Sequence, residues 1–149
     1  AEHPHEVEMA LWFHDAVYDL TASDNESRSA LWAKEALLTA TSEPDTAERV
    51  HALVMATKHT HTPAHGDEQV LVDVDLSILG ATPTRFAEYE VQIRQEYAHV
   101  PEPIFRSKRR EILKSFLDRD TIYTTPELHQ ALESQARTNL RAAVEGHGR

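Results

Sequence analysis

Glycine and proline are rare in this chain, and the prolines mostly stand where helices could begin. The 149 residues include four glycines and seven prolines. An all-β chain of this length would need many glycine-rich turns, so the shortage of glycine argues against that class. Thr82 before Pro83 and Thr125 before Pro126 suit helix N-termini, and Gly80 suits a helix C-terminus. These positions predict helices joined by short loops.

Apolar residues recur with the helical period along nearly the whole chain. Ser23 and Glu26 form a capping-box pattern, which marks one further helix start. A chain of 149 residues with 40% hydrophobic content can bury one continuous core. We therefore expect a single all-α domain over residues 1–149, built as a bundle of about six to seven helices. The expected helical segments span residues 6–18, 25–40, 47–59, 68–80, 84–99, 104–120 and 126–144.

The segment 68–80 fits two patterns. Apolar residues alternate with other residues over positions 70–76, which is typical of a strand. The segment also fits one helical stripe, with the spacing i, i+3, i+4, i+7 and i+8. That stripe comprises Leu71, Val74, Asp75, Ile78 and Leu79. We prefer a helix because no partner strand is found elsewhere in the chain.

Composition limits the kinds of site and partner. The chain has no cysteine, which rules out disulfides and thiolate metal sites and leaves imidazole and carboxylate as the strong metal ligands. Its formal charge of −10 makes long nucleic acids poor partners. The sequence contains neither a long apolar stretch nor a secretory leader. We therefore expect a cytoplasmic protein that neither spans a membrane nor binds long nucleic acids.

A histidine and an aspartate lie on stripes that otherwise hold apolar side chains. His14 continues the helical stripe of residues 7–11, so its imidazole should face the core, with Asp15 about 100° round the helix. Asp75 holds the same kind of position in its own segment. Burying an unpaired carboxylate is costly, so it must be protonated, paired with a cation or bound to a metal. Two carboxylates with a histidine favour a metal. The alternative is that His14 donates to a backbone carbonyl while the aspartates pair with Arg or Lys.

A series of sequence blocks resembles one protein family when it is taken in order. The blocks cover nearly all of residues 10–140. They are ALWFHDAVYD, NESRSA, ATKHT, DVDLSILG, YEVQIRQEYAHV, RREILKSFLDRDTIYTTPEL and ARTNL. In this order they resemble a bacterial branch of the HD superfamily of predicted metal-dependent phosphohydrolases. The resemblance implies an HD-domain-like helical bundle around a divalent metal.

The resemblance also implies a ligand set for that metal. His14 and Asp15 match the adjacent His-Asp pair that names the superfamily. Asp75 matches a later aspartate ligand of the superfamily. Asp73 is the alternative, because the block DVDLSILG holds two aspartates.

One part of the family pattern has no clear counterpart. The superfamily places a further histidine ligand on a helix well before the His-Asp pair, whereas thirteen residues precede His14. His3 and His5 are the candidates in this stretch, and they stand where the pattern has a connector. We therefore expect either that the N-terminal helix of the family pattern is missing from this chain, or that the site has three ligands and holds its metal weakly.

Four further residues are candidates for roles at the site. His59 matches a position where HD phosphodiesterases with two metals place extra histidines, so it can bind metal or contact substrate. Lys58 can offer positive charge to a phosphate, and Glu26 can act as a general acid or base. Arg109 occupies the arginine position of the family's block and can clamp a phosphate. Each also has a structural alternative. His59 can be an ordinary loop histidine and Lys58 a solvated cation at a helix C-terminus. Glu26 can be a capping residue, and Arg109 can be a charge on the solvent-exposed face of its helix.

These residues together predict a metal-dependent phosphohydrolase. A divalent metal held by imidazole and carboxylate lowers the pKa of water and polarises a phosphoryl oxygen. Mn or Fe is the expected metal, and Mg, Co, Ni and Zn are compatible with the same ligands. The expected substrate is a small phosphorylated molecule such as a nucleotide, and a homodimer is the assembly considered. The alternatives are a non-catalytic helical binding or regulatory protein with a structural or vestigial metal site and, more distantly, an oxygenase that needs two irons.

Overall fold

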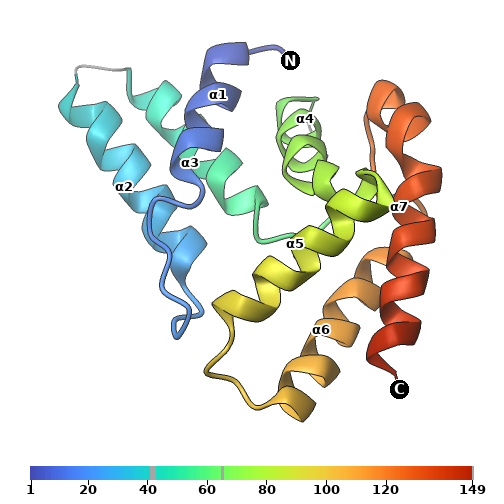
Figure 1. Cartoon of the computed structure of the whole chain (residues 1–149). Helices are drawn as coiled ribbons and strands as arrows, with labels where there is room; N and C mark the ends of the chain where they lie inside the picture. The colour runs from blue at the N-terminus through green and yellow to red at the C-terminus, as the bar shows by residue number, and fades with distance from the viewer. Residues whose placement is uncertain (41–42, 65, 149) are drawn as a thin grey trace. The chain divides into compact units, whose positions relative to one another are not determined.

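The computed structural model describes residues 1–40, 43–64 and 66–148, and its regular structure is entirely helical (Figure 1). No strand occurs in these residues, so the all-α prediction is confirmed and the strand reading of the segment 68–80 is wrong. None of the helices in these ranges has the length and apolar character needed to cross a membrane. The elements are α1 (Pro4–Phe13), α2 (Asn25–Thr39), α3 (Pro44–Ala56), α4 (Gly66–Asp75), the 3₁₀ helix η1 (Leu76–Gly80), α5 (Pro83–Glu96), α6 (Glu102–Leu117) and α7 (Pro126–His147).

Proline opens most of the helices, as the sequence predicts. α1, α3, α5, α6 and α7 each carry a proline in the first two helical positions, where a missing N–H leaves no hydrogen bond unmade. The hydroxyl of Thr82 also accepts the N–H of Arg85 at the start of α5. The capping box predicted at Ser23 and Glu26 is wrong, because α2 begins at Asn25 with Asp24 in the N-cap position.

α1 ends at Phe13, earlier than the predicted end at residue 18. The fully buried side chain of Ser29 in α2 binds the backbone just after this end of α1. Its hydroxyl accepts the N–H of Val17 (2.9 Å) and donates to the carbonyl of the same residue (3.3 Å). The N–H of Val17, which would otherwise donate to the carbonyl of Phe13, is thereby tied to α2. The helix therefore gives way to a turn that carries Asp15.

The predicted helix 68–80 changes character at its middle. α4 ends at Asp75, and the chain continues as the tighter 3₁₀ turn of η1. The carbonyls left free by this change find side-chain donors. The hydroxyl of Tyr123 donates to the carbonyl of Leu76 (2.8 Å), and Asn139 Nδ2 donates to the carbonyl of Leu79 (2.9 Å).

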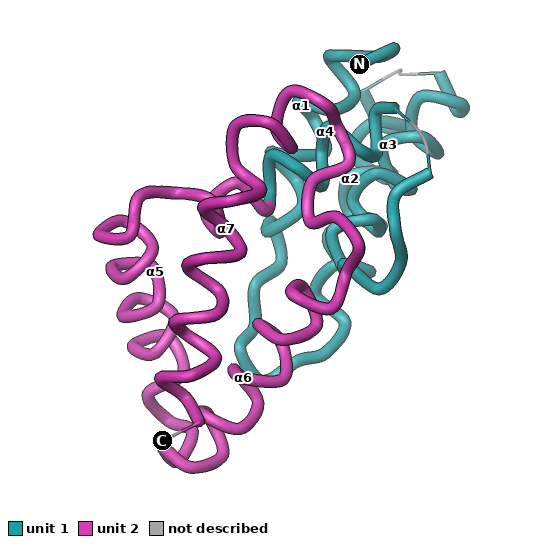
Figure 2. The backbone as a smooth tube through the Cα atoms, turned by 90° about the vertical axis from the view of Figure 1, so that its right-hand side faces the viewer, with its two compact units in different colours: residues 1–75 teal, residues 76–149 magenta. Residues whose placement is uncertain are grey.

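The chain divides into two compact units, residues 1–75 and residues 76–149, shown in teal and magenta in Figure 2. In unit 1, α1 packs against α2, α3 and α4, and α3 packs against both α2 and α4. In unit 2, η1 packs against α5 and α7, and α6 packs against α7. The unit 1 core comprises Val7, Ala10, Ala30, Ala33, Leu37, Ala47, Val50, Leu53, Val54 and Leu71. Buried in unit 2 are Leu76, Leu79, Phe86, Phe105, Leu113, Phe116, Ile122, Tyr123, Ala136 and Leu140. Each unit therefore has apolar residues of its own to bury, and cooperative folding of residues 1–149 as one domain stays a prediction.

Candidate functional site

Four of the predicted site residues lie together in unit 1. Asp75, the last residue of α4, is the centre of the group. Its Oδ1 lies 3.3 Å from His14 Nε2, and its Oδ2 lies 2.6 Å from His59 Nε2. His14 Nε2 also lies 3.1 Å from Asp15 Oδ2. The turn after α1, the loop after α3 and the end of α4 thus contribute to one cluster, which we call the His-Asp cluster (His14, Asp15, His59 and Asp75).

The imidazole of His14 is fixed by the backbone of its own helix. Its Nδ1 lies 2.6 Å from the carbonyl oxygen of Leu11, and since a carbonyl can only accept, Nδ1 carries a proton. The other nitrogen, Nε2, faces the carboxylates of Asp15 and Asp75. A bare lone pair pointing at two carboxylates would be repelled, so this position requires a positive charge.

In the absence of another cation, a proton supplies that charge. The hydrogen bond to Asp15, followed by that to Asp75, raises the pKa of His14 to about 10. Imidazolium is therefore the stable form at neutral pH. A neutral imidazole would leave Nε2 free to bind a metal, and the same carbonyl would still hold its ring in place.

Asp75 remains ionised although it is largely buried. Burial on its own raises the pKa of this carboxyl, but the hydrogen bonds from His14 and His59 outweigh burial and lower the pKa to about 2. The side chain is 22% exposed. Asp75 is thus a permanent carboxylate held at the edge of the unit 1 core between two imidazoles.

His59 reaches Asp75 through an unusual backbone conformation. Among the described residues it is the one non-glycine residue with a positive φ, at 55°. This left-handed conformation costs about 1 kcal/mol or more for most side chains, although histidine tolerates it better than most. The chain leaves α3 in this way, and the imidazole lies against Asp75. Backbone strain at a residue of the cluster is consistent with a functional role.

Asp15 corrects one part of the sequence prediction. We expected its carboxylate to be buried beside the apolar stripe of α1, but 68% of the side chain is exposed. The reason is the early end of α1, which places Asp15 in a turn. The prediction of a buried carboxylate is therefore wrong for Asp15. It agrees better with Asp75, whose side chain is 22% exposed. The predicted alternative is met in part, because His14 does donate to a backbone carbonyl, whereas both aspartates contact histidine.

The donor atoms suit a divalent cation in kind. Two imidazoles and two carboxylates form a ligand set for Mn, Fe, Co, Ni or Zn. Ligand atoms about 2.1 Å from one ion and at right angles lie about 3.0 Å apart, and the pairs in the cluster are 2.6 to 3.3 Å apart. As described, however, no group of three or more His, Asp or Glu side chains in residues 1–40, 43–64 and 66–148 is arranged to hold a metal ion. The donors instead form a hydrogen-bonded chain, so cation binding requires side-chain rotation.

Glu26 and Lys58 lie outside the hydrogen-bonded cluster. Glu26 stands in the first turn of α2, and Lys58 follows the end of α3, directly before His59. Both are half-buried. In the described part of the chain, neither side chain forms a hydrogen bond or ion pair with the His-Asp cluster. Their catalytic roles stay predictions.

Arg109 belongs to α6 in unit 2 and is occupied by a local partner. Its Nε and Nη2 both donate to the carboxylate of Glu90, the former over 3.2 Å. The guanidinium also lies 5.5 Å from the ring centroid of Tyr89. These contacts occupy the guanidinium N–H groups that would otherwise donate to a phosphate. We therefore leave Arg109 out of the proposed site, and its predicted contact with phosphate remains untested.

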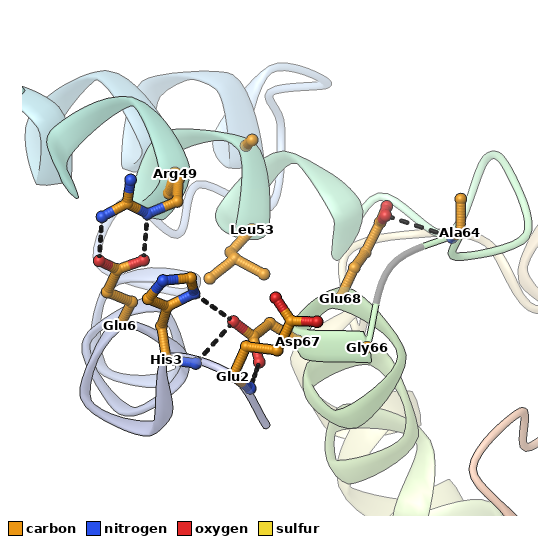
Figure 3. A pocket seen from close by; sticks show the side chains of 10 residues that line it. Glu2, His3, Glu6, Arg49, Leu53, Ala64, Gly66, Asp67 and Glu68 are labelled. Atoms are coloured by element: carbon orange, nitrogen blue, oxygen red, sulfur yellow. Dashed lines mark hydrogen bonds and ion pairs between the residues drawn. The ribbon is translucent and has the colours of Figure 1, made fainter. Parts of the chain in front are cut away.

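His3 does not reach the His-Asp cluster. The imidazole and backbone N–H of His3 bind Asp67 at 3.0 and 2.9 Å, at the opposite end of α4 from Asp75 (Figure 3). Since a helix rises about 1.5 Å per residue, Asp67 and Asp75 are separated by about 12 Å along α4. This pair lines a separate pocket of about 500 Å³ that also contains the ion pair of Glu6 with Arg49.

His5 also stays outside the cluster. His5 is exposed, with its nearest carboxylate on Glu8 at 3.9 Å. Asp73 is fully buried. Of the two aspartates in the block DVDLSILG, Asp75 is thus the one that contacts His14.

Negative charge is concentrated in unit 1. Residues 1–75 hold 15 Asp and Glu against 4 Lys and Arg, whereas residues 76–149 hold 10 against 11. Two of the four cations in unit 1 are engaged in ion pairs, Arg49 with Glu6 and Lys34 with Glu48. A surface of this kind attracts cations and repels phosphorylated molecules.

Sequence reasoning missed Ser29, which sets the position of the cluster by ending α1. A signal for it does exist in the sequence. Ser29, Ala33 and Leu37 share the spacing i, i+4 and i+8, and all three are buried. A hydroxyl on such a stripe needs a partner, but the spacing alone cannot name Val17 as that partner.

Comparison with known proteins gives no match: no family model fits the chain, and no curated protein and no solved structure is similar to it. The resemblance to the HD superfamily rests on the sequence blocks alone.

Proposed function

We propose that unit 1 is a metal-dependent phosphohydrolase whose cation is held by His14, Asp15, His59 and Asp75. One observation carries the proposal: a histidine fixed by its own backbone points Nε2 at two carboxylates, one of which also binds a second histidine. The HD-like sequence blocks support the same ligand set. Mn or Fe is the metal we expect, with Mg, Co, Ni and Zn as compatible substitutes.

Three residues of the cluster have distinct roles in this proposal. His14 keeps its ring in place through the carbonyl of Leu11, so deprotonation of Nε2 exposes a ligand already in position. Asp75 offers a carboxylate that stays ionised through the physiological pH range. Asp15 is 68% exposed, so once its contact with His14 is released it can turn toward the cation and accept a proton from water. A bound divalent cation supplies Lewis acidity, which lowers the pKa of water and polarises a phosphoryl oxygen.

The charge of unit 1 supports a role for the cation in substrate binding. A phosphorylated molecule approaching 15 acidic and 4 basic residues is repelled. Local positive charge at the cluster would offset that repulsion. The small phosphorylated substrate itself is proposed from the HD-like sequence blocks, and Lys58 is the nearest basic residue in sequence to His59.

Metal analysis and hydrolysis of a generic phosphoester test the proposal together. Purified protein should carry stoichiometric metal or gain it from Mn²⁺, and should hydrolyse p-nitrophenyl phosphate. His14→Ala and Asp75→Ala should each lose both properties. His5→Ala removes an exposed histidine outside the cluster and is the matched control. Full activity in both cluster variants would contradict the proposed function.

A second candidate is a helical binding or regulatory protein without catalytic activity. The observation that favours it is that the four side chains bond to one another, while none of the described residues form a ready metal-holding group. On this alternative the cluster is structural. The purified protein would then carry no metal, and its melting temperature would be unchanged by a chelator and by added Mn²⁺.

A further inference from the structure

Helix α2 presents a stripe of large apolar side chains that the other helices of unit 1 leave largely exposed, although the ring of Trp32 meets that of Phe13 edge-on at 6.3 Å. Leu31 and Trp32 are each 51% exposed, and Leu38 is 45% exposed. The opposite face of α2, which includes Ala30, Ala33 and Leu37, is buried in the unit 1 core. Large apolar side chains gathered on one helix face mark an interaction surface more often than scattered single residues do.

The same stripe carries one charge of each sign. Arg28 and Glu35 are both exposed and stand seven residues apart, with Leu31 and Trp32 between them. At about 100° per residue, seven residues bring the helix back to nearly the same direction. Neither charge forms an ion pair within the described part of the chain. The stripe thus reads basic, apolar, apolar, acidic along the helix.

This order is complementary to itself when the helix is reversed. A two-fold axis between residues 31 and 32 places Arg28 of each copy opposite Glu35 of the other copy, which gives two ion pairs. The same axis brings two Leu31 and two Trp32 side chains together at the centre. Isologous interfaces of homodimers need this self-complementarity.

We propose that the α2 stripe (Arg28, Leu31, Trp32 and Glu35) binds the same stripe of a second copy in antiparallel orientation. A uniformly basic or uniformly acidic partner would meet one charge of like sign, whereas a second copy satisfies both. The net negative charge of unit 1 opposes association, but exposed charges are screened beyond about 8 Å at 0.15 M salt. A single helix face is small, so the dimer is weak and forms at micromolar concentrations or above. The proposal is independent of the proposed hydrolase activity.

Reciprocal charge reversal tests the proposed register. The full chain should show a concentration-dependent monomer–dimer equilibrium in sedimentation experiments at 0.15 M salt. Arg28→Glu places like charges opposite each other at both ends, and Glu35→Arg does the same, so each should raise the dimer dissociation constant by about tenfold. The double variant restores both pairs and should return the dissociation constant to within about threefold of the original.

The matched control is a charge exchange on α5 in unit 2. Arg85 and Glu88 form an exposed ion pair three residues apart, and exchanging them should leave the dissociation constant unchanged. Circular dichroism confirms that each variant folds. Three outcomes would overturn the proposal: no self-association up to millimolar concentration, single variants that dimerise as before, or a double variant that stays as weak as the single ones. The last outcome would indicate a partner other than an antiparallel second copy.

Discussion

His14 links the stability of unit 1 to pH, because its imidazole binds a proton more tightly in the folded state than in the unfolded state. Its pKa in the folded protein is about 10, against an ordinary value of 6.5. The folded chain therefore binds one more proton than the unfolded chain between pH 6.5 and 10, and the free energy of unfolding must fall as pH rises through this window. Asp75 acts in the opposite sense: its pKa is lowered to about 2, so its contribution is lost as pH falls below about 3.8.

The first prediction follows from these two signs. With a chelator present, unit 1 should be most stable between about pH 4 and pH 6.5, and should lose on the order of 2 kcal/mol by pH 9.5. This loss is below the full linkage value because Asp15, the main partner of His14, is exposed and screened. Urea unfolding at several pH values measures it. His14→Gln should remove the alkaline decline, and a flat wild-type profile from pH 6.5 to 9.5 would count against an imidazolium at this position.

Single residues of the cluster could be identified from the sequence to different degrees. His14 and Asp75 stand out because a polar side chain interrupts an apolar stripe, which the helical period makes visible. His59 came from resemblance alone, because a positive φ after a helix end has no signature in the sequence without a glycine. The exposure of Asp15 could not be foreseen, since it depends on a hydrogen bond of Val17 with a side chain of the next helix.

At the scale of the secondary-structure elements, the hydrogen bond between Ser29 and Val17 decides where α1 ends. The second prediction is that Ser29→Ala lowers the free energy of unfolding by about 1 to 3 kcal/mol, because the N–H of Val17 loses its partner. The variant should also bind Mn²⁺ more weakly, since the turn that carries Asp15 is no longer fixed. Urea unfolding and metal titration measure the two effects. Ser27→Ala, on the same helix and with no such contact, should change the stability by less than about 0.5 kcal/mol.

The packing of η1 on α7 depends on the absence of a side chain at Gly80. A Cβ at this position would lie 2.7 Å from Leu132 Cβ and 3.1 Å from the hydroxyl oxygen of Tyr123. The third prediction is that Gly80→Ala destabilises unit 2 by about 1 to 3 kcal/mol through this overlap. Gly146 is the control, because nothing lies within 4 Å of a Cβ there. Gly146→Ala should be neutral or stabilise α7 by up to about 1 kcal/mol. Equal effects in thermal unfolding would refute the packing argument.

The helices were more predictable than their ends. Proline at the start of five helices is a local signal, because the ring restricts the backbone whatever lies around it. The end of α1 is set by Ser29 of the next helix, and the change from α4 to η1 involves Tyr123 and Asn139, which lie 47 and 60 residues away from the carbonyls they bind. The periodicity of residues 68–80 gave the helix correctly, but it could not place a change of helix type at residue 76.

At the scale of the whole molecule, the boundary between the two units falls inside a predicted helix. Residues 68–80 show no linker, no glycine or proline before Gly80 and no shift in hydrophobicity. Charge is the sequence property that does differ, with 15 acidic residues in unit 1 and 10 in unit 2. Such an asymmetry affects which charged species each unit attracts, and it carries no information about where the chain folds into separate cores.

The last prediction tests whether the two units unfold separately. Both tryptophans, Trp12 and Trp32, belong to unit 1, so tryptophan fluorescence follows that unit, whereas far-ultraviolet circular dichroism follows the helices of both. We expect the two urea transitions not to coincide. If the His-Asp cluster holds a metal as proposed, Mn²⁺ should raise the urea midpoint measured by fluorescence, because it stabilises folded unit 1. The part of the dichroism transition that belongs to unit 2 should stay in place. Gly80→Ala should lower the urea midpoint of unit 2, seen by dichroism, and leave the fluorescence midpoint of unit 1 unchanged. Coincident transitions that move together under both changes would instead establish one cooperative domain.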